Sequence, residues 1–208
     1  MINLSLIYDF DHSIGKAINS FLNYSNGFFT GFLKFVTTLG NSGLVFIIVA
    51  IIMLLFVRTR KAGAISLIAL LFGFLLTNLL LKNVVARLRP YSDTNSDFYL
   101  WWRSAGSLLE SGFSFPSGHT TAATGFGLSL FVCFKKKISW LYLLIPVFMG
   151  FTRIYFMVHY ASDVVGALFV GSVCSIGSYF TFKGISKFKF IEKAYNLPSI
   201  VSLFKREA

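Results

Sequence analysis

Charged residues are scarce in this sequence. Only 13% of its 208 residues are Asp, Glu, Lys or Arg, whereas typical soluble domains carry about 25%. Hydrophobic residues make up 55% of the chain, and the mean hydropathy is +0.71. Acids are the rarest charged type, with eight Asp and Glu against nineteen Lys and Arg. This composition excludes an ordinary soluble globular domain and indicates an integral membrane protein.

Cysteine is also rare. Cys133 and Cys174 fall in or at the ends of apolar stretches, where cysteine is typically a small packing residue. Two such residues do not form the even, closely spaced pattern of a disulfide framework or a metal site. No basic segment precedes an apolar core near the N-terminus, so we do not expect a cleavable signal peptide.

Long charge-free stretches dominate the chain. A bilayer core of ~30 Å needs roughly 20 apolar residues in a helix; two stretches reach that length outright, and the others reach it with their flanking residues. They lack the alternation of a β-barrel, so helices are expected. The sequence therefore predicts an all-α, polytopic membrane bundle with five spans in one domain. The stretches are about 43–57, 62–81, 120–134, 138–152 and 164–182.

Residues 1–42 are more mixed in character. Apolar residues recur at helical spacing from Ile14 to Leu22 and again from Phe28 to Val36, but polar residues such as Asn19 and Lys34 interrupt them. We interpret the segment as one or two amphipathic helices that lie on the outer membrane interface. The alternative is a sixth span.

The basic residues indicate the orientation in the membrane. With five spans, three Lys- and Arg-rich segments fall on the same side, which the positive-inside rule makes cytoplasmic. The net charge of +11 is therefore mainly a topology signal and does not indicate nucleic-acid binding. Residues 183–208 become a basic cytoplasmic tail, and the polar loop 83–118 lies outside. The basic residues are Arg58, Arg60, Lys61, Lys135, Lys136, Lys137, Lys183, Lys187, Lys189, Lys193, Lys205 and Arg206.

Three cations lie on the face that this rule normally depletes of positive charge. Lys82 ends a charge-free span, and Arg89 follows seven residues later, close to two helical turns, just before Pro90. Arg153 ends another charge-free stretch. Lys offers a point charge and Arg a planar fork to a phosphate, so these residues are candidate phosphate ligands. Arg87 and Arg103, in contrast, are typical of residues that contact lipid headgroups.

A Pro-Ser-Gly-His segment, residues 116–119, immediately precedes the third charge-free stretch. The N-terminus of a helix exposes free N–H groups and the positive end of its dipole, so it can bind an anion. Ser117 can add its hydroxyl, and Gly118 allows close approach to the backbone. The alternative is that Ser117 is an ordinary helix N-cap.

The third pattern consists of Arg153, His159 and Asp163. His159 and Asp163 are four residues apart, a spacing at which side chains meet on a helix. A carboxylate on one ring nitrogen of His159 would fix its tautomer and leave the other nitrogen free to attack phosphorus. His119 would then protonate the leaving oxygen. Two His and one Asp could instead bind Zn²⁺, but three nearby cations favour an anion.

Together these motifs resemble those of the type 2 phosphatidic acid phosphatase superfamily, which includes vanadium-dependent haloperoxidases. The resemblance covers residues 82–163 with the three motifs in order. One departure is Thr152, where the family usually has Ser, and another is the weak first span. The resemblance implies that His159 is a nucleophile that becomes phosphorylated and that Asp163 orients it. It further implies that His119 is the general acid and later the base. Lys82, Arg89, Ser117, Gly118 and Arg153 would bind the phosphate.

The resemblance also implies a metal-independent phosphatase in a bacterial inner or plasma membrane, with its site facing the periplasm or exterior and no cofactor. Its substrate would be a lipid phosphate or diphosphate. Undecaprenyl diphosphate is favoured, and phosphatidylglycerophosphate, phosphatidic acid and lipid A phosphate remain alternatives. A lipid phosphotransferase would use the same residues. A non-catalytic protein that binds or transports anionic lipids would need the cations but not the His159–Asp163 pair. A haloperoxidase would be expected as a soluble protein.

Overall fold

A computed structural model describes residues 4–134 and 136–189. Every regular element within these ranges is helical, which confirms the predicted all-α class. The longer helices are α1 (Leu4–Tyr24), α2 (Thr30–Leu39), α3 (Leu44–Leu54), α4 (Arg60–Phe74), α6 (Asp97–Ser104), α7 (Gly118–Cys133), α8 (Leu144–Tyr155) and α9 (Ala161–Ile185). The shorter ones are η1 (Asn41–Gly43), η2 (Leu75–Leu81), α5 (Lys82–Val85), η3 (Pro90–Ser92) and η4 (Ser139–Leu143).

Helix α7 lies at the centre of the bundle and packs against α4, α8 and α9. Small residues allow this close packing. A Cβ atom at Gly171 of α9 would lie 2.5 Å from Cβ of Thr124, and one at Gly127 would lie 2.6 Å from the carbonyl oxygen of Tyr142. Since real Cβ atoms essentially never approach other atoms so closely, these glycines fix how near the neighbouring backbones can lie.

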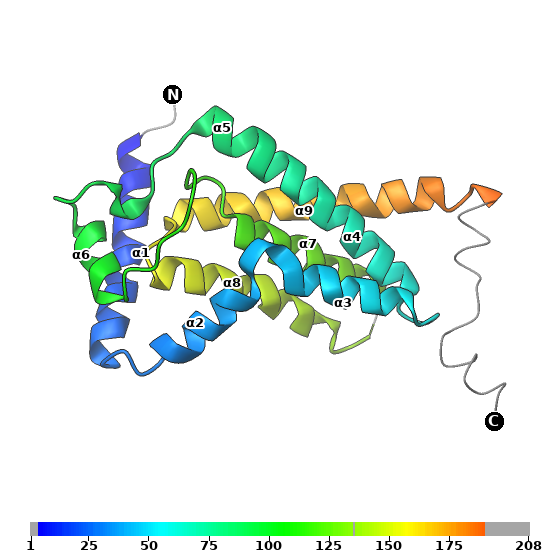
Figure 1. Ribbon diagram of the computed structural model, residues 1–208, viewed down its shortest axis with the longest axis horizontal. Helices are drawn as coiled ribbons and strands as arrows, with labels where there is room; N and C mark the ends of the chain where they lie inside the picture. Colours follow the sequence, from blue (N-terminus) through cyan, green and yellow to red (C-terminus); the bar gives the residue numbers. More distant parts are fainter. Residues whose placement is uncertain (1–3, 135, 190–208) are drawn as a thin grey trace.

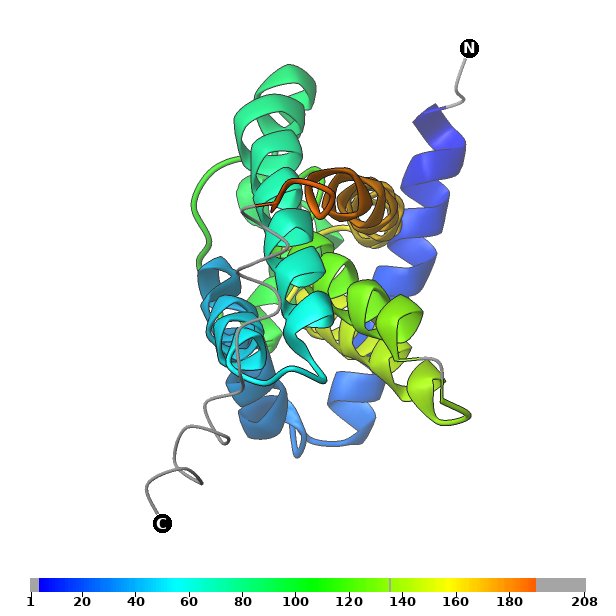
Figure 2. The ribbon, with the colours of Figure 1, turned by 90° about the vertical axis from the view of Figure 1, so that its right-hand side faces the viewer.

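Helix α1 has a different direction from the bundle. Figure 1 shows α1 running crosswise to α7, α8 and α9 at one end of the molecule, beside α6. Figure 2, a view from the other end, shows α1 on the flank of the bundle. Leu22 of α1 and Leu33 of α2 join Tyr155, Phe156 and Val158 in a buried cluster. The N-terminal helices are thus packed onto the domain, while their place at the membrane interface stays a prediction.

Large apolar side chains cover much of the outer surface. On α3 these include Ile48, Ile51 and Ile52, and on α9 they include Phe169 and Phe180; each is between 47% and 72% exposed. Contiguous apolar surface of this kind is unfavourable in water and matches the hydrocarbon of a bilayer.

The expectation of five strong spans is not confirmed. By length and composition two segments of the described chain can cross a membrane, Arg60–Ser92 and Ala161–Ile185, and a third can do so if α2 and α3, bent by 55°, form one broken span. The predicted stretch 120–134 forms α7, of 16 residues, and the stretch 138–152 forms η4 and most of α8, which together make the apolar helix Ser139–Tyr155. Both helices are shorter than the roughly 20 residues that a bilayer core needs, because α7 begins only at the Ser117 cap and ends at Cys133, and α8 gives way to a turn at Phe156.

The basic segments within the described residues gather at one end of the bundle. The α3–α4 junction, the connection after α7 and the end of α9 lie at the end away from α1 and α6 (Figure 1). This arrangement agrees with the expected asymmetry, and an integral membrane protein is supported. Which side of the membrane each end faces stays a prediction. Lys135, Lys193, Lys205 and Arg206 lie outside the described residues.

Candidate active site

A cavity of about 840 Å³ opens where the three predicted motifs meet. It lies between α2, η1 and α3 on one side and the helix of α4, η2 and α5 on the other, with the loop around residue 110 and the start of α7 completing its wall. Five of the eight predicted site residues line it: Lys82, Arg89, Gly118, His119 and His159. Ser117, Arg153 and Asp163 are fully buried beside or behind this wall.

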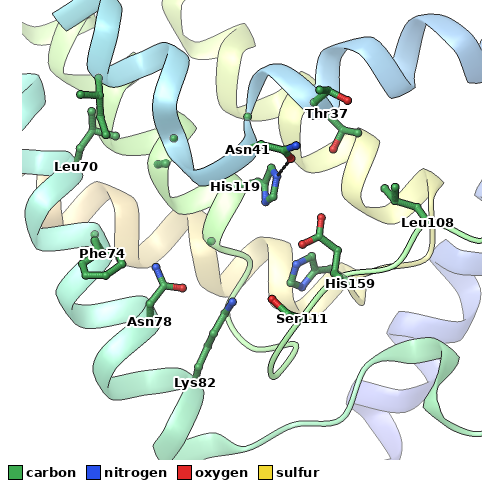
Figure 3. Close-up of a pocket in the computed structure, with 18 of the residues that line it drawn as sticks. Thr37, Asn41, Leu70, Phe74, Asn78, Lys82, Leu108, Ser111, His119 and His159 are labelled. Carbon is green, nitrogen blue, oxygen red and sulfur yellow. Dashed lines mark hydrogen bonds between the residues drawn. The ribbon is translucent and has the colours of Figure 1, made fainter. Parts of the chain in front are cut away.

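One helical face runs from apolar to charged along the cavity. Leu70, Phe74, Asn78 and Lys82 follow one another at intervals of four residues on the continuous helix of α4, η2 and α5, and all line the cavity. Figure 3 shows Lys82 reaching toward the space between His119 and His159. Its Nζ lies 4.0 Å from where a Cβ atom of Gly118 would be. Within the described residues the ammonium group of Lys82 has no hydrogen bond or ion pair, so it is available to an anion.

His159 lies in the turn between α8 and α9, and only 2% of it is exposed. Its Nδ1 is 3.6 Å from Oδ2 of Asp163 and 3.5 Å from Oγ of Ser114, while its Nε2 is 3.4 Å from Nη1 of Arg89. With the Nδ1 proton directed at the carboxylate, the lone pair of Nε2 faces the cations. Burial, reinforced by Arg153 and Arg89, holds the pKa of His159 below its usual range although Asp163 opposes the shift. The imidazole is therefore neutral at pH 7.

Asp163 is held by several donors at the first turn of α9. Its Oδ2 accepts hydrogen bonds from the Ser114 hydroxyl and from the backbone N–H of Tyr160, the latter at 2.9 Å. Its Oδ1 accepts one from Nη1 of Arg87 at 2.7 Å. The interpretation of Arg87 as a headgroup-contacting residue is therefore wrong, because its guanidinium group points inward to a buried carboxylate. Sequence spacing gave no sign of Arg87 or Ser114 in this role.

The two arginines of the site are already engaged. Arg89 donates from Nε, Nη1 and Nη2 to the carbonyl oxygens of Gly112, Val158 and Ser111 at 3.0, 2.8 and 2.7 Å. Arg89 thereby ties the loop at residues 111–112 to the turn that carries His159. It also places positive charge beside Nε2 of His159.

Arg153 is completely buried. It donates from Nη1 to the Thr37 hydroxyl and from Nη2 to the carboxylate of Glu110. Its Nε is buried and has no hydrogen-bond partner within the described part of the chain. The adjacent Thr152 hydroxyl donates to the Met149 carbonyl at 2.8 Å inside α8, so the Thr-for-Ser departure leaves a hydroxyl used within the helix.

Glu110 is a site residue that the sequence analysis missed. Its carboxylate lines the cavity and forms an ion pair with Arg153. Burial alone would raise the pKa of Glu110, but Arg153, His119 and Arg89 together hold that pKa below its ordinary value. A negative charge thus lies where the cations would receive a phosphate. A lone acid in a polar loop, nine residues before His119, carried no motif that could reveal this.

His119 has a partner from the N-terminal part of the chain. Its Nε2 is 3.0 Å from Oδ1 of Asn41, the contact drawn in Figure 3. A Cβ atom at Gly40 would lie 2.8 Å from Cδ2 of the His119 ring, so only glycine leaves room for the imidazole there. The sequence analysis missed both positions.

Ser117 behaves as an N-cap, the alternative considered for it. Its Oγ accepts hydrogen bonds from the backbone N–H and from the hydroxyl of Thr120, at 3.4 and 3.0 Å. This leaves the hydroxyl proton of Ser117 for another acceptor, so its role as a phosphate donor stays a prediction. The Zn²⁺ alternative has no support in the described residues, where no three His, Cys, Asp or Glu side chains could hold a metal ion.

Comparison with known proteins shows the family of the chain. Residues 62–186, more than half of the chain, match the PAP2 superfamily. The chain belongs to the PAP2 superfamily. The resemblance inferred from the three motifs is thereby confirmed, and all eight predicted site residues lie inside the matched PAP2 segment.

Relatives within the superfamily carry enzymatic names. The chain is 27% identical to an undecaprenyl-diphosphatase of Sulfolobus acidocaldarius over 165 residues, 78% of this chain and 76% of the relative. It is 35% identical to a lipid A 4'-phosphatase of Bacteroides thetaiotaomicron over 104 residues, but this covers only 48% of this chain and 44% of the relative. The expectation that the protein is a hydrolase is confirmed at the level of the PAP2 superfamily.

Solved structures share the fold. A transmembrane PAP2-type phosphatidylglycerolphosphate phosphatase from Bacillus subtilis superposes with a TM-score of 0.66 at 24% identity, covering 90% of this chain and 92% of that one. Aquifex aeolicus LpxE superposes with a TM-score of 0.60 at 24% identity, covering 80% of this chain and 92% of that one. At this level of identity the similarity establishes the PAP2 fold alone.

Proposed function

We propose that this PAP2 protein hydrolyses the phosphate or diphosphate group of a membrane lipid through a phosphohistidine formed on His159. A polyprenyl diphosphate such as undecaprenyl diphosphate is the favoured substrate. The observation that carries the proposal is the orientation of His159. One ring nitrogen faces a buried carboxylate, and the other faces a cavity lined by cations.

In the first step, Nε2 of His159 attacks the terminal phosphorus, the N–P bond forms and the P–O bond to the leaving group breaks. His119 gives its proton to the leaving oxygen. Lys82, Arg89 and Arg153 stabilise the charge that spreads over the equatorial oxygens. Asp163 stabilises the positive charge that develops on the imidazole of His159.

In the second step, water attacks the phosphohistidine. His119, now neutral, takes a proton from the water, the new P–O bond forms and the N–P bond breaks. The products are inorganic phosphate and the shortened lipid phosphate, or the lipid alcohol if the substrate is a monoester. His159 returns to its neutral form, which its buried position favours.

The helix of α4, η2 and α5 supports a lipid as the substrate. Leu70 and Phe74 face the cavity beyond the polar pair Asn78 and Lys82, and Ile47 and Leu67 add further apolar surface. A molecule with an anionic head and a hydrocarbon chain matches this sequence of groups. The match to the Sulfolobus relative covers 78% of this chain, and the diphosphatase name of that relative favours a polyprenyl diphosphate. We propose that the site faces the exterior, as the basic segments indicate.

The direct test is phosphate release from a short-chain polyprenyl diphosphate in detergent, with EDTA present. We expect activity that His159→Ala abolishes. His12→Ala is the matched control, because the imidazole of His12 pairs with Asp97 at 2.8 Å, away from the cavity, and this variant should retain activity. Full activity in His159→Ala would refute the nucleophile, and loss with EDTA that Zn²⁺ restores would refute the metal-independent mechanism.

A panel of substrates then assigns the lipid. We expect polyprenyl diphosphate to give a higher kcat/KM than phosphatidylglycerophosphate, phosphatidic acid and lipid A diphosphate. Reaction in ¹⁸O-labelled water separates hydrolysis from phosphotransfer, because only hydrolysis places the label in free phosphate. Tight lipid binding without phosphate release would instead indicate a non-catalytic binding or transport protein.

A further inference from the structure

Asp11, on α1, is a buried acid that the proposed mechanism does not use. Only 1% of it is exposed, although it lies on a helix outside the matched PAP2 segment. Its Oδ1 accepts a hydrogen bond from the backbone N–H of Ser162 at 2.7 Å, and its Oδ2 accepts one from the Ser162 hydroxyl at 2.8 Å. Nη2 of Arg87 donates to the same Oδ2 at 2.7 Å. Burying a carboxylate is costly unless it is paired and hydrogen-bonded, and here the partners are Ser162, at the start of α9, and Arg87, in the loop after α5.

Arg87 connects this acid to the candidate catalytic carboxylate. Its Nη1 donates to Oδ1 of Asp163 and to the Ser162 hydroxyl, both at 2.7 Å. The guanidinium group lies over the ring of Tyr160, with Cζ 3.8 Å from the ring centroid. Two carboxylates and an aromatic face thus fix the planar fork of Arg87. Arg87 does not line the cavity, so it does not reach a bound phosphate.

We propose that Asp11 and Arg87 form a positioning pair that orients Asp163, and through it His159, for phosphoryl transfer. The inference rests on the proposed role of His159 as the nucleophile. Arg87 occupies Oδ1 of Asp163, which leaves Oδ2 for the Ser114 hydroxyl, the Tyr160 N–H and the imidazole Nδ1. The carboxylate cannot rotate away from His159 without breaking the bond to Arg87.

Charge explains why the pair needs both members. Arg87 alone beside Asp163 would neutralise that carboxylate and weaken its attraction for the positive imidazole of the phosphoryl-transfer step. Asp11 returns one negative charge, so the cluster of Asp11, Arg87 and Asp163 keeps a net charge of −1 with Asp163 ionised. Arg87 then fixes the orientation of the Asp163 carboxylate without cancelling the negative charge that stabilises the positive imidazole of His159. The N-terminal helix α1 thereby becomes a part of the catalytic apparatus that the three family motifs do not contain.

The experiment measures kcat and KM with polyprenyl diphosphate for Arg87→Met, Arg87→Lys and Asp11→Asn in the full chain. A displacement of about 1 Å at a catalytic group can cost on the order of 100-fold in rate. We expect a loss in kcat of about that size for Arg87→Met and of about tenfold for Asp11→Asn, with KM within twofold of the wild type. Arg87→Lys should recover part of the loss. Arg103→Met is the matched control, because Arg103 is exposed on α6.

The outcomes separate this inference from the proposed function. If His159→Ala abolishes activity while Asp11→Asn and Arg87→Met keep kcat within twofold of the wild type, the positioning pair is refuted and the nucleophile stands. A rise in KM at unchanged kcat would also refute the pair, since it would place Arg87 in binding. Should Arg87→Met fail to fold, Asp11→Asn decides. A kcat loss that disappears when rates are divided by the folded fraction, measured by thermal unfolding, likewise overturns the proposal.

Discussion

The matched PAP2 segment and the N-terminal segment contribute differently to the same site. Residues 62–186 carry the histidines and the charged side chains that line the cavity or flank His159. Residues 4–43 contribute Asp11, Thr37 and Asn41, which contact Arg87, Arg153 and His119 respectively. The comparison shows that one part of the chain carries the candidate reactive groups and the other carries side chains that contact them.

The two kinds of residue also differ in how far sequence alone reveals them. The reactive groups are charged residues and histidines at fixed spacings, and they stand out in an apolar chain. Their N-terminal partners include a Thr and an Asn, which are common in any polar stretch and acquire meaning only from what they touch. Substitutions in both segments, compared for the size of their effects, test this division.

The largest effect is expected for Asp163→Asn in the matched segment. The amide keeps the shape of the carboxylate but removes the charge that stabilises the positive imidazole, and it can favour the wrong tautomer of His159. We expect kcat to fall by about 10³- to 10⁴-fold, as for the equivalent change in a catalytic triad. Steady-state kinetics on polyprenyl diphosphate checks this, and a loss below tenfold would contradict the assigned role of Asp163.

Thr37→Val tests the N-terminal partner of Arg153. Valine matches the shape of threonine but cannot accept the hydrogen bond from the buried guanidinium group, and hydrogen bonds to charged groups contribute about 1.5–3 kcal/mol. We expect kcat/KM to fall by about 10- to 100-fold. Thr37→Ser is the control, because serine keeps the hydroxyl that accepts the hydrogen bond from Arg153. Equal losses in both variants would mean that α2 acts only through its packing.

Asn41→Ala tests the partner of His119. Loss of the amide oxygen frees the imidazole to rotate, so fewer molecules present it correctly to the leaving group. Because a single neutral hydrogen bond contributes about 1 kcal/mol, we expect a decrease in kcat of about five- to tenfold. Retention of the wild-type kcat would show that His119 is positioned by its own helix alone.

Glu110→Gln tests the competition between Glu110 and a phosphate for Arg153. Removal of the negative charge from the cavity should let an anion bind more tightly, so the inhibition constant for inorganic phosphate should fall by a few-fold, within the modest range of a partly screened ion pair. Inhibition assays at constant ionic strength provide the measurement. A higher inhibition constant would mean that Glu110 assists the anion, for example by orienting Arg153.

The smallest effect is expected when the pH is lowered from 7 to 6, because the protonation state of His159 should not change. Burial lowers the pKa of His159 to about 4, so the neutral imidazole persists as the pH falls from 7 to 6, and protonation begins only at lower pH. Histidine-selective NMR in detergent, with His159→Ala to assign the signal, should show no change in the His159 ring shifts over this interval. Titration of that signal at or above pH 6.5 would contradict the buried, neutral nucleophile.

The sequence by itself determined the helical class, the membrane character and the candidates for the reactive groups. Charge is costly in an apolar chain, and therefore Lys82, Arg89, Arg153, His159 and Asp163 could be selected as candidates from their charge, position and spacing. The number of spans was not determined in this way, because the charge-free stretches 120–134 and 138–152 form α7, of 16 residues, and the apolar helix Ser139–Tyr155, both shorter than the roughly 20 residues that a bilayer core needs.

Only the tertiary structure decided which residues support the reactive groups. Asp11 and Arg87 are 76 positions apart, and Asn41 and His119 are 78 positions apart, so no local pattern links them. The same reason explains why the sequence analysis assigned Arg87 to the lipid headgroups. The direction of an arginine side chain depends on whether a buried acid lies within its reach, and the acids that Arg87 contacts, Asp11 and Asp163, belong to helices that come close to it only in the folded chain.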